Sequence, residues 1–252
     1  MLIHYNLLMA KNKYLSLIQK ESYKLGFLFT GFSLNFPPYR RWICNQFHKL
    51  VYGSFVLQRP WTMTKWLGIP ILKCPFDLWV YQELIFDLKP DVLIESGSHL
   101  GGGAFYFASI CDLLGKGRVI SIDLENQKDR ATHPRITYLQ GSSIDPIILD
   151  HVQNLIREDE KVMVWLDSAH EKEHVLAEMY AYAPMVSKDY YLVVEDTNLN
   201  GNPVWLGYGA GPAEAVATFL TRNNEFIVDK DCEKYYLTFN PGGFLKRVVE
   251  ES

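Results

Sequence analysis

Acidic side chains follow two apolar segments of the chain in positions that suit metal binding. The segment KVMVWLDS (161–168) ends in Asp167, and YYLVVED (190–196) ends in Glu195 and Asp196. Three carboxylates at one sheet edge would repel one another and raise each other's pKa values unless a cation lay among them. Oxygen ligands of this kind suit Mg²⁺ or another hard divalent ion. We therefore predict a metal site formed by these three residues and favour it over three separate solvated carboxylates.

A bound divalent cation would orient a substrate hydroxyl and lower its pKa, which makes the oxygen a nucleophile. His170 lies three residues after Asp167 and could serve as the general base. A structural hydrogen bond near the start of the following helix is the alternative for His170, and both interpretations stay open. We expect His174, one helical turn later, to be structural. The predicted catalytic residues are thus His170 and Asp167.

The segment IESGSHLGGG (94–103) is the predicted cofactor turn. Its glycines let the backbone approach a ligand closely, and the helix that follows offers free N–H groups. A dinucleotide site requires G-x-G-x-x-G, but His99 replaces the middle glycine. The spacing of Glu95, Gly97 and Gly101 instead suits S-adenosylmethionine, whose amino group the acidic side chain would bind. Taken alone, the turn is also compatible with a plain glycine-rich connection.

Two further positions support a nucleoside beside this turn. Asp123 ends the apolar segment ISIDLE, where a carboxylate can accept hydrogen bonds from both ribose hydroxyls. This feature serves NAD and S-adenosylmethionine equally. Ser142 and Ser143 either contact the adenine or only shape a turn. The complete set of predicted cofactor contacts is Glu95, Gly97, Ser98, Gly101, Asp123, Ser142 and Asp167.

The elements that position these residues alternate along the chain. Expected strands cover 91–96, 118–125, 136–143, 161–168, 190–196, 225–229 and 234–240. Expected helices cover 76–90, 103–114, 145–157, 171–186 and 211–223. Alternation of this kind predicts an α/β fold with a doubly wound, Rossmann-like, mainly parallel seven-stranded sheet. In such sheets ligands bind outside the carboxyl ends of the strands, where the predicted site residues lie.

Residues 1–75 differ in composition from the rest of the chain. They form a predicted N-terminal helical or irregular extension to a domain of residues 76–252. This region is rich in aromatic and basic side chains, with a rough helical period around Tyr14, Leu15, Ile18 and Leu25. The segments at 37–42 and 58–70 suggest irregular or short helical structure. We expect the extension to cover part of the core or to form an oligomer contact, with a substrate lid or a membrane-surface patch as further options.

Composition narrows the possible partners. A net charge of −4 argues against general nucleic-acid binding, which requires a clustered basic surface. We find neither an apolar segment long enough to span a bilayer nor a signal-peptide pattern. Four separated cysteines without a CxxC motif suit a reducing compartment. We therefore expect a cytoplasmic homo-oligomer that has no membrane span and binds a small molecule.

The motifs TMTKWLGIPILKCPFDLWVYQELI, IESGSHLGGG, ISIDLE, WLDSAHEKEHV, VVEDTN and TFNPGGFLKR occur in order between residues 60 and 248. Together they resemble the cephalosporin hydroxylase/rhamnosyl O-methyltransferase family. The resemblance implies a class I methyltransferase fold, S-adenosylmethionine and a divalent metal. It matches Asp167, Glu195 and Asp196 to the family's metal ligands. It matches Glu95, Gly97, Gly101 and Asp123 to the cofactor contacts. His170 resembles the base of related metal-dependent sugar O-methyltransferases.

An iron-dependent oxygenase, which the word hydroxylase suggests, is rejected. That chemistry needs two histidines and a carboxylate as iron ligands, and an H-x-D or H-x-E motif usually supplies one histidine and the carboxylate. None of the seven histidines is followed two residues later by Asp or Glu. The leading hypothesis is metal-dependent O-methylation of a hydroxyl on a sugar or natural-product scaffold. An NAD-dependent oxidoreductase and a non-catalytic accessory subunit are the alternatives. The loop 201–212, with Trp205 and Tyr208, is expected to border the acceptor or to pack without binding it.

Overall fold

The computed structural model describes residues 19–24, 26, 31, 36–53 and 59–249. The chain separates into two compact units, residues 1–47 and 48–252. The predicted helical period at Tyr14, Leu15, Ile18 and Leu25 lies outside the described residues. In the first unit, residues 19–24 are helical, and helix α2 (Pro37–Gly53) begins there and ends in the second unit. A helix thus covers 37–42, and the domain boundary between residues 75 and 76 stays a prediction.

Seven strands form the main sheet. They are β3 (Val92–Ser96), β4 (Arg118–Asp123), β5 (Ile136–Gln140), β6 (Val162–Leu166), β7 (Tyr191–Val194), β8 (Phe226–Val228) and β9 (Phe244–Arg247). Their spatial order is β5-β4-β3-β6-β7-β9-β8. The first five strands in this order pair in parallel, whereas β9 runs antiparallel to both β7 and β8. The prediction of a mainly parallel seven-stranded sheet is confirmed.

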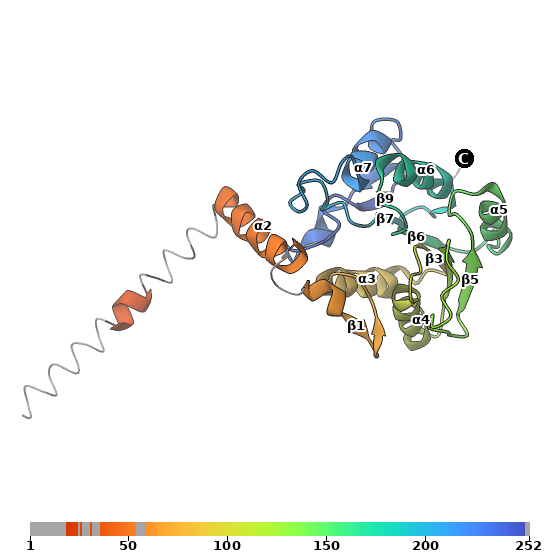
Figure 1. Cartoon of the computed structure of the whole chain (residues 1–252), viewed down its shortest axis with the longest axis horizontal. Helices are drawn as coiled ribbons and strands as arrows, with labels where there is room; N and C mark the ends of the chain where they lie inside the picture. Colours follow the sequence, from red (N-terminus) through yellow and green to blue (C-terminus); the bar gives the residue numbers. More distant parts are fainter. Residues whose placement is uncertain (1–18, 25, 27–30, 32–35, 54–58, 250–252) are drawn as a thin grey trace, which may run out of the picture. The chain divides into compact units, whose positions relative to one another are not determined.

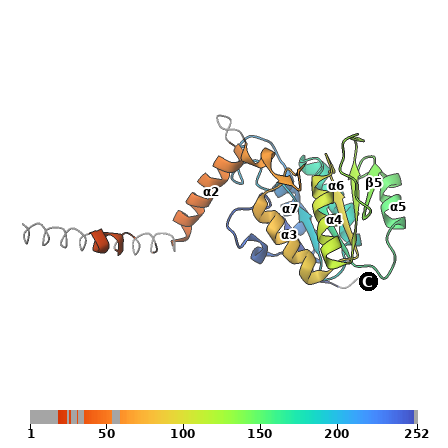
Figure 2. The same ribbon diagram turned by 90° about the horizontal axis from the view of Figure 1, so that it is seen from below.

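Helices cover both faces of the sheet, as the doubly wound class requires. They are α3 (Pro75–Leu88), α4 (Gly102–Leu114), α5 (Pro146–Asn154), α6 (Lys172–Tyr182) and α7 (Pro212–Leu220). Figure 1 shows α6 and α7 on one side of the sheet and α3 and α4 on the other. The core has a corresponding division, because one apolar cluster joins the strands to α5, α6 and α7 and another joins them to α3 and α4. Figure 2 shows α3 and α4 side by side on their face.

The central strands explain why the site residues gather at one edge. Every residue of β3, β6 and β7 is buried, as expected for parallel strands covered on both faces. Strand β3 pairs with β4 on one side and with β6 on the other, so the chain reverses its direction of winding at β3. Ligands of open α/β sheets bind at this switch point, beyond the carboxyl ends of the strands.

The C-terminal part corrects one prediction. Residues 234–240 are not a strand; a short 3-10 helix (Lys230–Glu233) and turns replace it, and the seventh strand is β9. The backbone N–H of Phe239 donates to Asp77 Oδ2 at 2.8 Å, and its carbonyl accepts from the N–H of Asn198. A side chain and a loop residue therefore pair with the backbone N–H and carbonyl of Phe239, which would otherwise have paired with a neighbouring strand.

The region before α3 also differs from expectation. After a 3-10 helix (Pro60–Met63), strands β1 (Lys65–Trp66) and β2 (Ile69–Pro70) form a small antiparallel hairpin, although we expected no strand before residue 76. Most predicted elements of the main domain exist but are shorter by a few residues at their ends. No helix among the described residues is both long and apolar enough to cross a membrane.

Candidate functional site

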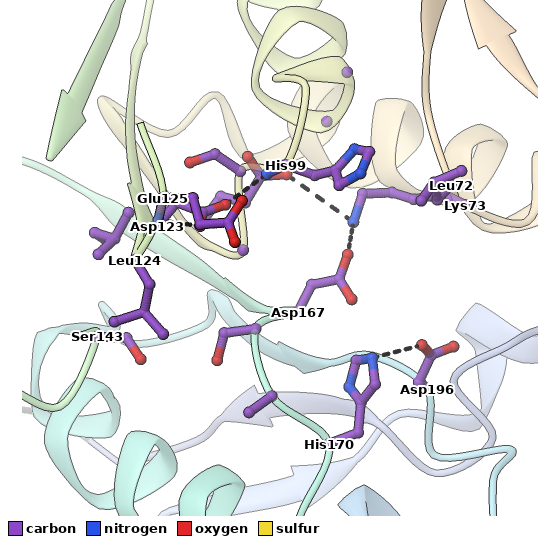
Figure 3. A pocket seen from close by; sticks show the side chains of 18 of the residues that line it. Leu72, Lys73, His99, Asp123, Leu124, Glu125, Ser143, Asp167, His170 and Asp196 are labelled. Atoms are coloured by element: carbon purple, nitrogen blue, oxygen red, sulfur yellow. Dashed lines mark hydrogen bonds and ion pairs between the residues drawn. The ribbon is translucent and has the colours of Figure 1, made fainter. Parts of the chain in front are cut away.

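A cavity of about 700 Å³ opens at the carboxyl ends of β3, β4 and β6. Most of the predicted site residues line it: Glu95, Gly97, Ser98, Asp123, Ser142, Asp167, His170 and Asp196. Gly101 and Glu195 do not line the cavity but lie directly beside residues that do. Figure 3 shows the acidic and histidine side chains converging on the cavity from separate loops.

The turn after β3 brings backbone very close to the end of β6. Gly97 has φ +89°, and a Cβ atom there would lie 1.9 Å from the carbonyl oxygen of Asp167. No L side chain fits this position, which explains the glycine. Gly101 precedes the first turn of α4 with φ +80°. The backbone of the turn thus forms a tight cradle next to Asp167.

Glu95 is almost completely buried at the base of this cradle. Its Oε2 accepts a hydrogen bond from Ser121 Oγ at 2.8 Å, and Ser98 Oγ lies 2.6 Å from the same hydroxyl. Burial raises the pKa of Glu95 to about 7, although nearby Lys73 and the Ser121 hydrogen bond act to lower it. The buried carboxyl lines the cavity, so its contact with a cofactor amino group is sterically allowed and stays a prediction.

Asp123 ends β4 with its carboxylate held by backbone groups. The N–H of His99 donates to Oδ2 at 2.7 Å, and the N–H of Glu125 donates to Oδ1 at 3.0 Å. Arg130 lies 3.6 Å from Oδ2. These contacts orient the carboxylate at the cavity wall, and the syn and anti lone pairs of its oxygens allow further hydrogen bonds. Its predicted role on a ribose fits this place.

Three ligand-type side chains converge at the other side of the cavity. The donor atoms of Asp167, His170 and Asp196 all lie within 4.8 Å of one another, as a metal ion would require. His170 Nε2 is 3.2 Å from Asp196 Oδ2. Burial raises the pKa of Asp196 to about 6, an effect that His170 opposes. The two carboxylates fit a hard divalent cation, and the imidazole lies within reach of the same point.

Glu195, the third predicted metal ligand, has a different partner. Its Oε1 lies 2.6 Å from Lys73 Nζ, and burial beside Asp167 raises its pKa well above the usual value. Lys73 Nζ is also 2.6 Å from Asp167 Oδ2 and 4.0 Å from Glu95 Oε1. Burial lowers the pKa of Lys73, but the surrounding carboxylates more than offset this effect. A buried lysine therefore already neutralises part of the acidic cluster.

A second layer of buried groups orients the residues that follow β7. The N–H of Asp196 donates to Asn240 Oδ1 at 3.0 Å, and Asp196 itself has φ +55°. Asn240 Nδ2 donates to the hydroxyl of Tyr81 at 2.6 Å, and that hydroxyl also hydrogen-bonds to Glu195. Asn240 thus holds a left-handed backbone conformation that places the Asp196 side chain beside His170.

Aromatic side chains form another part of the cavity wall. Tyr52, Trp61 and Trp205 line it, with the rings of Tyr52 and Trp61 stacked at 5.2 Å. The Arg59 guanidinium lies 5.7 Å from the centre of the Trp205 ring. Trp205 thus lines the cavity, and its contact with an acceptor stays a prediction. Tyr208 does not line the cavity, but its ring contacts that of Trp205.

His174, Ser142 and Ser143 form the cavity wall beside β5. His174 Nε2 lies 3.3 Å from Ser143 Oγ and 3.2 Å from Ser168 Oγ. A hydrogen bond with Glu178 raises the pKa of His174. His174 lines the cavity along with Ser142 and Ser143, so this wall offers polar groups where an adenine was expected.

Four residues at the site are not among those predicted from sequence: Lys73, Asn240, Trp61 and Tyr52. Lys73 is the single charged residue in the apolar stretch IPILKCP, and a charge in such a stretch indicates a buried partner. Three predicted carboxylates at one site also indicate that a basic side chain of the protein lies near them. Asn240 precedes Pro-Gly-Gly in TFNPGGF, a turn pattern at the end of the predicted strand 234–240.

The chain is similar to known proteins over most of its length. The sequence matches the family described as rhamnosyl O-methyltransferase/CmcI over residues 58–248. A rhamnosyl O-methyltransferase of Mycobacterium leprae (strain TN) is 38% identical over 214 residues, which cover 81% of this chain and 90% of that protein. One of Mycobacterium tuberculosis (strain CDC 1551 / Oshkosh) is 39% identical over 212 residues, covering 81% and 85%.

Solved structures show the same fold. An apo structure of CmcI has a TM-score of 0.57 and 23% identity, with 75% of this chain and 77% of that chain covered. A CmcI structure described as containing Mg and SAM has a TM-score of 0.57 and 22% identity, covering 75% and 78%. The prediction of a class I methyltransferase fold is confirmed, and the sequence match settles the relationship: the chain belongs to the rhamnosyl O-methyltransferase/CmcI family.

Proposed function

We propose that the protein is a metal-dependent O-methyltransferase that uses S-adenosylmethionine to methylate a hydroxyl group of a sugar. The position of Asp167 carries the proposal. Its carbonyl oxygen packs against Gly97 of the cofactor turn, and its carboxylate belongs to the cluster with His170 and Asp196. One residue therefore joins the place expected for a methyl donor to the place expected for a cation. Methyl transfer to a metal-held hydroxyl requires this proximity.

The residues present fit both predicted groups. The cradle at Gly97 has no room for a side chain, and the carboxylates of Glu95 and Asp123 line the adjoining cavity. Asp167 and Asp196 offer the oxygen atoms that Mg²⁺ prefers, with His170 beside them, and Glu195 stays a predicted third ligand. A divalent cation bound there would supply Lewis acidity that lowers the pKa of an acceptor hydroxyl.

The protein's own groups have distinct roles in this proposal. His170 accepts the hydroxyl proton, and its partner Asp196 at 3.2 Å stabilises the resulting imidazolium. Asp123 and Glu95 bind and orient the methyl donor from the two sides of the turn. Trp61 and Trp205 offer flat apolar faces to an acceptor ring and exclude water from it.

The names of the relatives support a sugar acceptor. The mycobacterial proteins are named rhamnosyl O-methyltransferases, and the sequence match covers most of their length. The aromatic part of the cavity wall suits a deoxysugar, which presents apolar C–H faces to an aromatic ring. We keep a homo-oligomeric state and a cytoplasmic location as predictions.

The test combines binding with turnover. Isothermal titration with S-adenosylmethionine, with and without Mg²⁺, should show cofactor binding. Incubation with rhamnosides and other hexosides should then yield methyl ethers detected by mass spectrometry. Absence of binding at millimolar cofactor would exclude the methyltransferase role. Binding without turnover, together with a stoichiometric co-purified protein, would favour a non-catalytic accessory subunit.

A further inference from the structure

Lys73 is the one buried lysine that contacts the acidic cluster in the described part of the chain. Its side chain is 4% exposed, and its ammonium lies 2.6 Å from both Asp167 Oδ2 and Glu195 Oε1. These partners follow Lys73 by 94 and 122 positions, so the contact depends on the complete fold. Figure 3 shows Lys73 reaching one oxygen of Asp167, while the other oxygen points away from the lysine.

The surrounding structure holds the lysine in this position. Ile71, two residues earlier, is buried in the core, and Cys74 directly precedes helix α3. A Cβ atom on Gly103 would lie 1.9 Å from Glu95 Oε1 and 3.0 Å from Lys73 Cε. The glycine at 103 thus leaves the room in which Lys73 and Glu95 approach each other. The lysine stem is confined on several sides, which favours a single orientation of its ammonium.

We propose that Lys73 is a positioning residue: its ammonium anchors Asp167 to the buried Glu195 and so presents the remaining carboxylate oxygen of Asp167 to a divalent cation. This inference rests on the proposed function, because it concerns the same cation site. Carboxylate ligands of metals are commonly held by hydrogen bonds from a surrounding layer of residues, and removal of such a partner costs about 10–100-fold in metal affinity. Lys73 has the geometry of such a partner for two carboxylates at once.

An opposite role is also physically possible and predicts the opposite result. A lysine that merely fills the place of the cation would compete with it for Asp167 and Glu195. Removing its charge would then strengthen cation binding, since the carboxylates would become both free and more strongly attractive. The sign of the change in cation affinity therefore separates anchoring from competition.

The experiment measures Mn²⁺ binding to the full chain by the electron paramagnetic resonance signal of the free ion, without cofactor or acceptor. Lys73→Met keeps the length and apolar stem of the side chain but removes its charge. We expect the Kd for Mn²⁺ to rise about 10–100-fold. Lys65→Met, at an exposed position of β1, is the matched control and should bind Mn²⁺ like the parent protein. Circular dichroism establishes that each variant is folded.

A second pair of variants covers the case in which Lys73→Met does not fold. Glu195→Gln alone keeps the contact between Lys73 and Asp167, whereas Lys73→Met with Glu195→Gln removes both buried charges together. We expect the double variant to bind Mn²⁺ at least about 10-fold more weakly than Glu195→Gln alone. Unchanged or tighter Mn²⁺ binding on loss of Lys73, in either background, would overturn the proposal.

The outcome is separable from that of the proposed function. A parent protein that binds Mn²⁺ but methylates no sugar contradicts the sugar methyltransferase activity and leaves the comparison of variants decisive for Lys73. A parent protein that methylates sugars, with equal Mn²⁺ affinity in Lys73→Met, contradicts the positioning role alone.

Discussion

His170 Nε2 lies 3.2 Å from Asp196 Oδ2, and this contact joins the loop after β6 to the loop after β7. The two residues come from neighbouring parallel strands whose carboxyl ends meet at the same edge of the sheet. Their proximity to Asp167 places an imidazole and two carboxylates around one point of the cavity. In the proposed mechanism, a proton acceptor and a cation site therefore lie within reach of one bound hydroxyl.

Asp196→Asn tests the cation site without disturbing the cofactor turn. Because an amide is a weaker ligand than a carboxylate, we expect at least about a 100-fold loss of Mg²⁺-dependent turnover. Binding of S-adenosylhomocysteine, measured by titration calorimetry, should stay within about threefold of the parent value, a change well below 1.4 kcal/mol. Asp159→Asn, at an exposed position, is the control. Full activity in Asp196→Asn would show that the metal assignment is wrong.

His170→Gln separates general-base catalysis from a structural hydrogen bond. Glutamine preserves a polar group of similar reach but cannot take the proton, so we expect kcat to fall by about 10²–10⁴. Thermal stability and cofactor affinity should change little, because His170 is partly exposed at the cavity wall. His151→Gln, on the exposed side of α5, serves as the control. A loss of only a few-fold in kcat would support the structural interpretation.

Asp123→Asn addresses the cofactor side. A carboxylate that accepts hydrogen bonds from ribose hydroxyls contributes about 1.5–3 kcal/mol per charged hydrogen bond. We therefore expect S-adenosylhomocysteine to bind at least about 10-fold more weakly, with Mn²⁺ affinity unchanged. The control is Asp129→Asn, in the exposed segment between β4 and β5. If Asp123→Asn binds S-adenosylhomocysteine as tightly as the parent protein, the proposed contact between Asp123 and the ribose is wrong.

The raised pKa of Asp77 predicts that the stability of the protein depends on pH, independently of catalysis. Burial raises its pKa from 3.8 to about 7, although hydrogen bonds from Thr238 and from the N–H of Phe239 oppose the shift. A carboxyl whose pKa is raised in the folded state stabilises the protein fully below its unfolded pKa, near 4. This contribution is lost as the pH rises through about 7.

Asp77→Asn removes this titration while keeping an oxygen that can accept from Phe239. The Tm of the variant minus that of the parent should therefore become more positive between pH 5 and pH 8, by about 5 °C. Thermal unfolding followed by circular dichroism across this range gives the difference directly. Asp87→Asn, exposed on the same helix, is the control. A difference in Tm that does not change with pH would contradict the raised pKa of Asp77.

The sequence predicted the sheet and the edge that carries the site because both follow from local patterns. The apolar segments before Glu95, Asp123 and Asp167 are short enough to be buried parallel strands, and the polar residues directly after them must then lie at one edge. The glycine spacing identified the turn in which Gly97 takes a positive φ. These features require only knowledge of neighbours in the chain.

Contacts between distant segments could not be predicted in the same way. Lys73 reaches Glu195 across 122 positions, and no local pattern specifies which carboxylate a buried lysine meets. The segment 234–240 has strand-like composition, but the hydrogen bond from Phe239 to Asp77 and the role of Asn240 beside Asp196 hold it in a loop. Tertiary partners here override the local preference for a strand.

The most direct test of the account is methyl transfer from S-adenosylmethionine to a rhamnoside before and after removal of divalent cations. The parent protein should form the methyl ether with Mg²⁺ present, lose at least about 100-fold of its rate after treatment with EDTA, and regain the rate when Mg²⁺ is restored. Methyl transfer that proceeds equally fast in EDTA would contradict the central claim that the cluster of Asp167, Glu195 and Asp196 activates the hydroxyl through a bound cation.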